Sequence, residues 1–74
     1  MSAAHPLIAQ LAARRRELGL SQERLAARIY VGSRTVSWWE TGRSWPPVDR
    51  IESYAKAVGM RLALLPADAR VDNE

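Results

Sequence analysis

Residues 18–43 read LGLSQERLAARIYVGSRTVSWWETGR, in which two short segments with apolar residues at helical spacing flank a turn. The apolar positions that share a face are Leu25, Ala26 and Ile29 in the first segment, then Val36 and Trp39 in the second. Ser21 is a suitable N-cap because its hydroxyl oxygen accepts a hydrogen bond from a free backbone N–H, and Gly42 is a stop signal. The sequence therefore predicts helices over residues 22–29 and 33–41.

The flanking sequence predicts two more helices. Pro6 and Gly19 bound one amphipathic segment, and Pro47 and Gly59 bound another, since proline suits a first helical turn and glycine follows a last one. The apolar faces of these segments contain Leu7, Ile8, Leu11 and Leu18, then Val48, Ile51, Ala55 and Val58. We expect a helix over residues 6–18 and a fourth that ends before Gly59.

Residues 60–65, Met-Arg-Leu-Ala-Leu-Leu, alternate with period two and predict a short β-strand with Met60, Leu62 and Leu64 on one face. A frayed tail would leave these apolar side chains uncovered, and a lone strand has an unpaired edge. We therefore expect this strand to pair with its copy across a homodimer. The predicted fold is an all-α domain of four short helices with this added strand, over residues 1–66, followed by an acidic tail over residues 67–74.

Charge divides the chain into two parts. Residues 1–65 hold ten Lys and Arg against five Asp and Glu, a net charge of +5. Residues 66–74 hold Arg70 against Asp68, Asp72 and Glu74, a net charge of −2. A basic body with a sequence pI of about 10.2 favours a polyanionic partner, either nucleic acid or an anionic membrane surface.

The composition of the 74 residues, 47% hydrophobic and 26% charged, is typical of one small folded domain. With no cysteine and a single histidine, His5, the chain lacks the usual ligands for a metal site and the groups for a catalytic centre. We expect no enzymatic activity, no metal and no cofactor. No apolar run predicts a membrane span or a signal peptide, and we expect a cytoplasmic protein that does not bind membranes.

Two short helices joined by three or four residues have the spacing of a DNA-binding helix-turn-helix, whose second helix enters the major groove. The residues also resemble the Xre/Cro, lambda-repressor-like helix-turn-helix family over about residues 7–59. The motifs that carry this resemblance are Leu-Gly-Leu-Ser-Gln at 18–22, Leu-Ala-x-x-Ile at 25–29, Thr-Val-Ser-x-Trp-Glu at 35–40 and x-Gly-Arg at 41–43. The resemblance implies a DNA-binding fold.

The outward face of the helix over 33–41 is the predicted reading surface. The expected base contacts are Ser33, Arg34, Ser37 and Trp38, and the expected phosphate contacts are Ser21, Gln22, Thr35 and Arg43. Arg34 is the best candidate for readout, because its guanidinium can donate to O6 and N7 of guanine. Trp38 and Trp39 cannot both face inward. We expect Trp39 in the core and Trp38 against DNA, on a thymine methyl or a sugar-phosphate edge.

Family resemblance implies two further features. Arg15 lies on the otherwise apolar face of the first helix, and the family often pairs such an arginine with the glutamate that closes the recognition helix, here Glu40. Many relatives have glycine where this chain has Tyr30. Positive φ there would cost a non-glycine residue about 1–2 kcal/mol, so we expect a turn of a different shape.

These observations predict a repressor that binds a double-stranded DNA operator as a homodimer. The operator would be a palindrome with half-sites about 10–11 bp apart. The C-terminal residues 54–66 are also similar to DNA-binding antitoxins of the HipB type, in which the last strand pairs across the dimer. The alternative is therefore an antitoxin that binds a toxin protein and represses its own operon.

Overall fold

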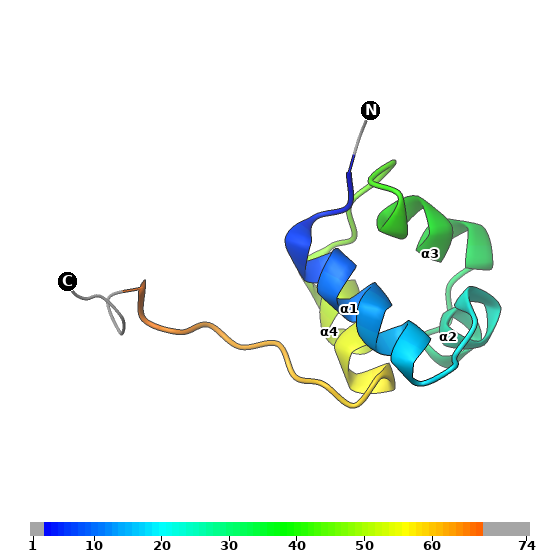
Figure 1. Ribbon diagram of the computed structural model, residues 1–74. Coiled ribbons are helices and arrows are strands. Elements are labelled where there is room, and N and C mark those ends of the chain that lie inside the picture. The colour runs from blue at the N-terminus through cyan, green and yellow to red at the C-terminus, as the bar shows by residue number, and fades with distance from the viewer. Residues whose placement is uncertain (1–2, 68–74) are drawn as a thin grey trace.

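The computed structural model describes residues 3–67, which form four helices in the predicted order (Figure 1). These helices are α1 (Pro6–Glu17), α2 (Gln22–Arg28), α3 (Ser33–Glu40) and α4 (Val48–Ala57). The first three end one residue earlier than predicted, because Leu18, Ile29 and Thr41 are their C-caps. The helical part of the predicted fold is confirmed. Within residues 3–67 we find no helix with the length and apolar character needed to cross a membrane.

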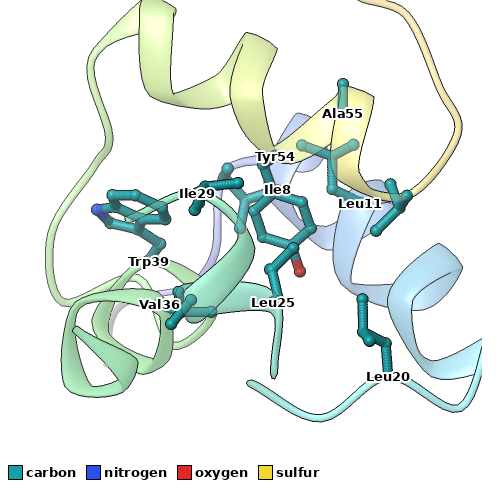
Figure 2. Packing of buried hydrophobic residues seen from close by; sticks show 11 residues of the cluster. Ile8, Leu11, Leu20, Leu25, Ile29, Val36, Trp39, Tyr54 and Ala55 are labelled. Atoms are coloured by element: carbon teal, nitrogen blue, oxygen red, sulfur yellow. The ribbon is translucent and has the colours of Figure 1, made fainter. Parts of the chain in front are cut away.

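One hydrophobic core joins the helices, with α1 and α2 each in contact with both α3 and α4. Figure 2 shows side chains from all four helices and from the segment between α1 and α2 converging on it. The buried residues are Ile8, Leu11, Leu20, Leu25, Ala26, Ile29, Val36, Trp39, Tyr54, Ala55 and Val58. Each large side chain contributes about 1.5–3 kcal/mol by leaving water, and this packing fixes α3 against the other helices.

All four helices end in the same hydrogen-bonded turn. The residue after each C-cap has positive φ: Gly19 (68°), Tyr30 (61°), Gly42 (79°) and Gly59 (74°). The next N–H then donates to the carbonyl five residues earlier, in the pairs Leu20 to Arg15, Val31 to Ala26, Arg43 to Trp38 and Met60 to Ala55. This Schellman pattern satisfies carbonyls that the helix itself cannot pair, and it reverses the chain direction.

The turn after α2 corrects one expectation. We expected Tyr30 to give this turn a different shape, but Tyr30 adopts the same positive φ as the three glycines that follow the other helices. The Tyr30 side chain is 90% exposed and so contributes little to the core. The flanking Ile29 is buried and Val31 is partly buried against the core, and the helix-ending hydrogen bond holds the backbone between them. The packing on both sides therefore imposes a conformation that glycine would adopt at lower cost.

The turn after α3 needs glycine for a different reason. A Cβ atom on Gly42 would overlap the backbone of Ala3, which precedes α1. Positive φ and the close approach of a second segment both exclude a side chain at this position.

The chain after α4 has no regular secondary structure over residues 60–66. Figure 1 shows it leaving the end of α4 and running away from the helices. Met60 packs partly against the core, whereas Leu64 and Leu65 are 97% and 84% exposed. The predicted strand is not formed in this single chain, and its pairing with a second copy stays a prediction. Residues 68–74, most of the acidic tail, lie outside the described residues.

Candidate nucleic-acid interface

The outward face of α3 presents the residues predicted to contact bases. Ser33 and Arg34 are exposed, Ser37 is half-buried, and Trp38 is 39% exposed. Within residues 3–67 the side chains of Ser33 and Arg34 have no hydrogen-bond or ion-pair partner. Both can therefore form new hydrogen bonds without first breaking old ones. The predicted phosphate contact Thr35 is half-buried at the margin of this face.

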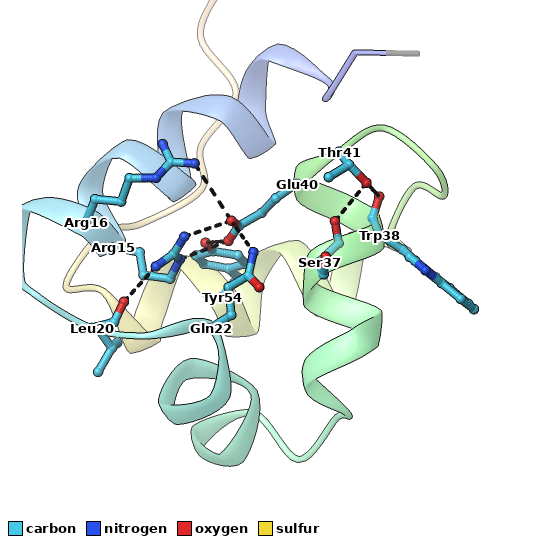
Figure 3. Close-up of polar contacts among 9 residues, drawn as sticks. All are labelled: Arg15, Arg16, Leu20, Gln22, Ser37, Trp38, Glu40, Thr41 and Tyr54. Atoms are coloured by element: carbon cyan, nitrogen blue, oxygen red, sulfur yellow. Dashed lines mark hydrogen bonds and ion pairs between the residues drawn. The ribbon is translucent and has the colours of Figure 1, made fainter. Parts of the chain in front are cut away.

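Trp38 and Trp39 point to opposite sides of α3. Trp39 is 4% exposed within the core, and Figure 3 shows the Trp38 indole directed away from the helices. The guanidinium carbon of Arg43 lies 5.5 Å from the centroid of the Trp38 ring, a cation–π distance. The Arg43 N–H also donates to the Trp38 carbonyl at 2.8 Å. The turn at Gly42 thus brings a cation back over the outward-facing indole.

The start of α2 holds the other two predicted phosphate contacts, and both are already used in the fold. The Ser21 hydroxyl oxygen accepts a hydrogen bond from the Arg24 N–H at 3.0 Å, which caps α2. Gln22 is half-buried, and its Nε2 donates to Glu40 Oε1 at 3.0 Å. One amide N–H of Gln22 and the hydroxyl proton of Ser21 remain available to a phosphate oxygen.

A buried polar cluster joins all four helices beneath α3 (Figure 3). We call it the Glu40 network, and its members are Arg15, Gln22, Glu40 and Tyr54. The Arg15 guanidinium donates to both carboxylate oxygens of Glu40, from Nε at 2.9 Å and from Nη2 at 2.8 Å. The Tyr54 hydroxyl donates to Glu40 Oε2 at 2.6 Å. Arg15 Nη1 also donates to the Leu20 carbonyl at 2.7 Å, so most of its donors are used.

Burial and hydrogen bonding act in opposite directions on Glu40, whose side chain is 3% exposed. Desolvation alone would raise the pKa of this carboxyl group. The hydrogen bonds from Arg15, Tyr54 and Gln22 together outweigh that effect and hold the pKa below its ordinary value of 4.5. Burial and the hydrogen bond to Glu40 raise the pKa of Tyr54. Glu40 is therefore ionised and Tyr54 is neutral at neutral pH.

The network anchors the C-terminal end of α3. Glu40 is the last residue of α3, and its partners belong to α1, α2 and α4. A bidentate arginine–carboxylate pair fixes direction as well as distance. The network therefore ties the C-terminal end of α3 to the other three helices. Arg16, 64% exposed and 3.9 Å from Glu40, adds little because surface ion pairs are weak.

Two members of the network were not assigned to it from the sequence. Tyr54 had no role of its own, and Gln22 was assigned only to phosphate. A signal for Tyr54 was present, because it follows Ile51 by three residues on the apolar face of α4. A tyrosine buried there needs a partner for its hydroxyl group, and the closing glutamate of α3 is that partner.

Comparison with known families supports the interpretation of the outward face of α3 as a DNA-binding surface. A family model described as Helix-turn-helix matches residues 11–65. The chain belongs to this helix-turn-helix family, the Xre and lambda-repressor-like group. Comparison with curated proteins and with solved structures found no match. Family membership and the exposed face of α3 together assign the chain to the DNA-binding transcription regulators.

Proposed function

We propose that this chain is a repressor that binds a palindromic operator as a homodimer and acts in the cytoplasm without catalysis. The observation that carries the proposal is the exposed Arg34, which has no side-chain partner within residues 3–67 and lies at the start of a helix anchored by the Glu40 network. A rigid helix with a free guanidinium on its outer face is suited to the major groove, where arginine pairs with guanine.

The other predicted contacts surround Arg34. Ser33, Ser37 and Trp38 lie along the same outward face of α3 and would contact base edges beside it. Arg43, beyond the end of α3, and Ser21 and Gln22, at the start of α2, would contact phosphates on either side of the groove. Gln22 is the best placed of these, because its bond to Glu40 orients the amide.

The homodimer is supported by the apolar surface around the C-terminal segment. Residues 60–63, Leu65 and the neighbouring helices line a groove of about 340 Å³, whose apolar lining includes Leu7, Leu11, Ile51, Met60, Leu62 and Leu65. Leu64 next to it is 97% exposed. Strand pairing between two copies would satisfy the backbone edge and would cover these side chains together.

An antitoxin is the second candidate. The sequence from Tyr54 to Pro66 is similar to the end of HipB-type antitoxins, and the uncovered leucines after α4 are also a suitable surface for a second protein. A toxin and a second copy of the chain would occupy the same apolar surface around residues 60–65. Identification of the protein bound there therefore distinguishes an antitoxin from a stand-alone repressor.

The test of DNA binding is selection of duplexes from a random library with the purified full chain, followed by affinity measurements over a salt series. Arg34→Ala should lower the affinity for the selected duplex by about 10- to 100-fold and relax the preference at one base position. Arg43→Ala should weaken binding to random as well as to selected duplexes and reduce the salt slope by about one. Equal losses on both kinds of duplex for Arg34→Ala would contradict its role in readout.

The test of the partner is a pull-down of the tagged chain from its own cells, with sequencing of bound DNA and mass spectrometry of bound protein. A palindromic site with the chain alone supports the stand-alone repressor. A stoichiometric second protein encoded beside it supports the antitoxin.

A further inference from the structure

Trp38 is an unusual residue for a surface that reads hydrogen-bonding groups. Its indole has one N–H donor and is otherwise apolar, yet it lies on the outward face of α3 with 39% of its surface exposed. The neighbouring predicted contacts on this face, Ser33, Arg34 and Ser37, are all polar. The ring is not required by the core, since Trp39 fills that position.

The structure holds this indole in place from one side. The Trp38 carbonyl accepts hydrogen bonds from the backbone N–H groups of Arg43 and Ser44, at 2.8 and 3.2 Å, and from the Thr41 hydroxyl at 3.4 Å. This backbone arrangement places the Arg43 guanidinium over the ring at 5.5 Å. The indole and the guanidinium therefore form one stacked pair at the end of α3. The turn at Gly42 determines the relative position of the two groups.

The major groove offers only one apolar group among the four unmodified bases, the 5-methyl group of thymine. The other groups on the base edges are mainly hydrogen-bond donors and acceptors, for which polar side chains are better partners. We propose that Trp38 is a specificity-determining residue that reads a thymine by packing its ring against this methyl group. The inference rests on the proposed DNA-binding function and names the base feature that this position recognises.

Arg43 contributes to the same contact in two ways. Its stacking on the indole limits the ring to one orientation, and a cation–π pair strengthens when DNA displaces the surrounding water. The edge of the guanidinium remains able to donate to a phosphate beside the thymine. The stacked pair thus links a sequence-specific contact to a backbone contact.

The experiment uses the duplex selected with the full chain and removes one methyl group at a time by replacing each thymine with deoxyuridine. We expect a loss of about fourfold in affinity at one thymine of each half-site, the value for one buried methyl group. Trp38→Ala should abolish the sensitivity at that thymine and leave the response at the other thymines unchanged. Trp38→Phe, which keeps an apolar ring, should retain part of the sensitivity.

Two further variants are compared with Trp38→Ala: Trp45→Ala is a control, and Arg43→Gln tests the stacking partner. Trp45 is also an exposed indole, 67% exposed and packed edge-to-face on His5 at 5.1 Å, but it lies between α3 and α4. Trp45→Ala should leave the response to deoxyuridine unchanged. Arg43→Gln should reduce the methyl sensitivity without moving it to another thymine. Circular dichroism melting curves establish that each variant is folded before its affinity is compared.

The inference is overturned if Trp38→Ala binds thymine and deoxyuridine duplexes with the same ratio as the unaltered chain. It is also overturned if no thymine in the selected site is sensitive to loss of its methyl group. A selection that enriches no sequence over random DNA has a different meaning, because it contradicts the proposed function itself and removes this inference with it.

Discussion

The Glu40 network and the segment over residues 60–65 reverse the usual distribution of polar and apolar groups. The network buries a carboxylate and a guanidinium, and partners within the chain satisfy both. The C-terminal segment instead leaves leucines at 97% and 84% exposure, beside an open apolar groove. The difference shows that one chain completes the support of α3 by itself, whereas the same chain leaves the apolar surface after α4 uncovered.

Removal of the Glu40 carboxylate should have the largest effect. Glu40→Ala leaves the Arg15 guanidinium buried without its partner, and loss of one member of a buried pair costs about 3–5 kcal/mol of unfolding free energy. A loss of that size approaches the whole stability of a small domain. Chemical denaturation followed by circular dichroism measures it.

Glu17→Ala is the matched control for that variant. Glu17 pairs with Arg14 at 3.3 Å, but the two side chains are 68% and 40% exposed. A surface pair of this kind contributes about 0–1 kcal/mol. Similar losses for Glu40→Ala and Glu17→Ala would show that the buried network does not stabilise the fold more than a surface pair does.

Charge placed on the C-terminal segment should break the proposed dimer. Leu64→Asp and Leu62→Asp should raise the dimer dissociation constant by about 30-fold or more, as expected when an interface anchor is lost. Leu64 is 97% exposed in the single chain, so its substitution should leave the helices folded. Light scattering measures the mass. Leu18→Asp, at the end of α1, is the control, and a dimer that survives Leu64→Asp and Leu62→Asp would place the interface elsewhere.

Acid should weaken the network in a defined direction. The pKa of Glu40 in the folded chain lies below its ordinary value of 4.5. Its ionised form therefore stabilises the fold above about pH 4.5, and this contribution is lost as the pH falls through the lowered pKa. Tyr54→Phe removes one hydrogen bond that lowers this pKa, so its acid-unfolding midpoint should move to higher pH.

The same substitution should cost about 1.5–3 kcal/mol at neutral pH, because the lost hydrogen bond is made to a charged group. Tyr30→Phe is the matched control, since the Tyr30 side chain is 90% exposed and lies in no part of the network. An acid midpoint that Tyr54→Phe leaves in place would contradict the role given to the hydroxyl group.

The smallest expected effect is a gain in stability. Tyr30 has a φ of 61°, and glycine occupies the equivalent position after the other three helices. Tyr30→Gly should therefore relieve backbone strain. The gain is reduced by the larger backbone entropy of glycine in the unfolded chain, and we expect about 0.5–1 kcal/mol net. Thermal melting measures it, with Gly19→Ala as the opposite change. A Tyr30→Gly variant that melts at a lower temperature would contradict the strain at this turn.

The sequence predicted the helices well because their signals are local. Prolines, glycines and one good N-cap bound apolar stretches whose period is helical. The predicted C-terminal ends of α1, α2 and α3 therefore differ from the observed ends by only one residue. The turn at Tyr30 was predicted wrongly because a residue preference was weighed without the packing of its buried neighbours. That packing depends on tertiary structure and outweighs about 1–2 kcal/mol of strain.

The candidate site was only partly accessible from the sequence. Arg15 and Glu40 could be related through a family pattern, whereas Tyr54 and Gln22 join them through distances set by the packing of four helices. The stacking of Arg43 on Trp38 depends on the path of the chain after Gly42. The strand over residues 60–65 was predicted to pair with a second copy of the chain. The single chain lacks that partner and does not form the strand.

The Glu40 carboxylate has a consequence for how the molecule opens. Its oxygens bind groups from α1, α2 and α4, and Glu40 itself belongs to α3. Detachment of any one helix therefore breaks at least one hydrogen bond to this buried carboxylate, which raises the free energy of partial opening towards that of complete unfolding. The slowest amide protons in the four helices should then exchange with a single common free energy, and a protease should cleave within the helices only when all four are open.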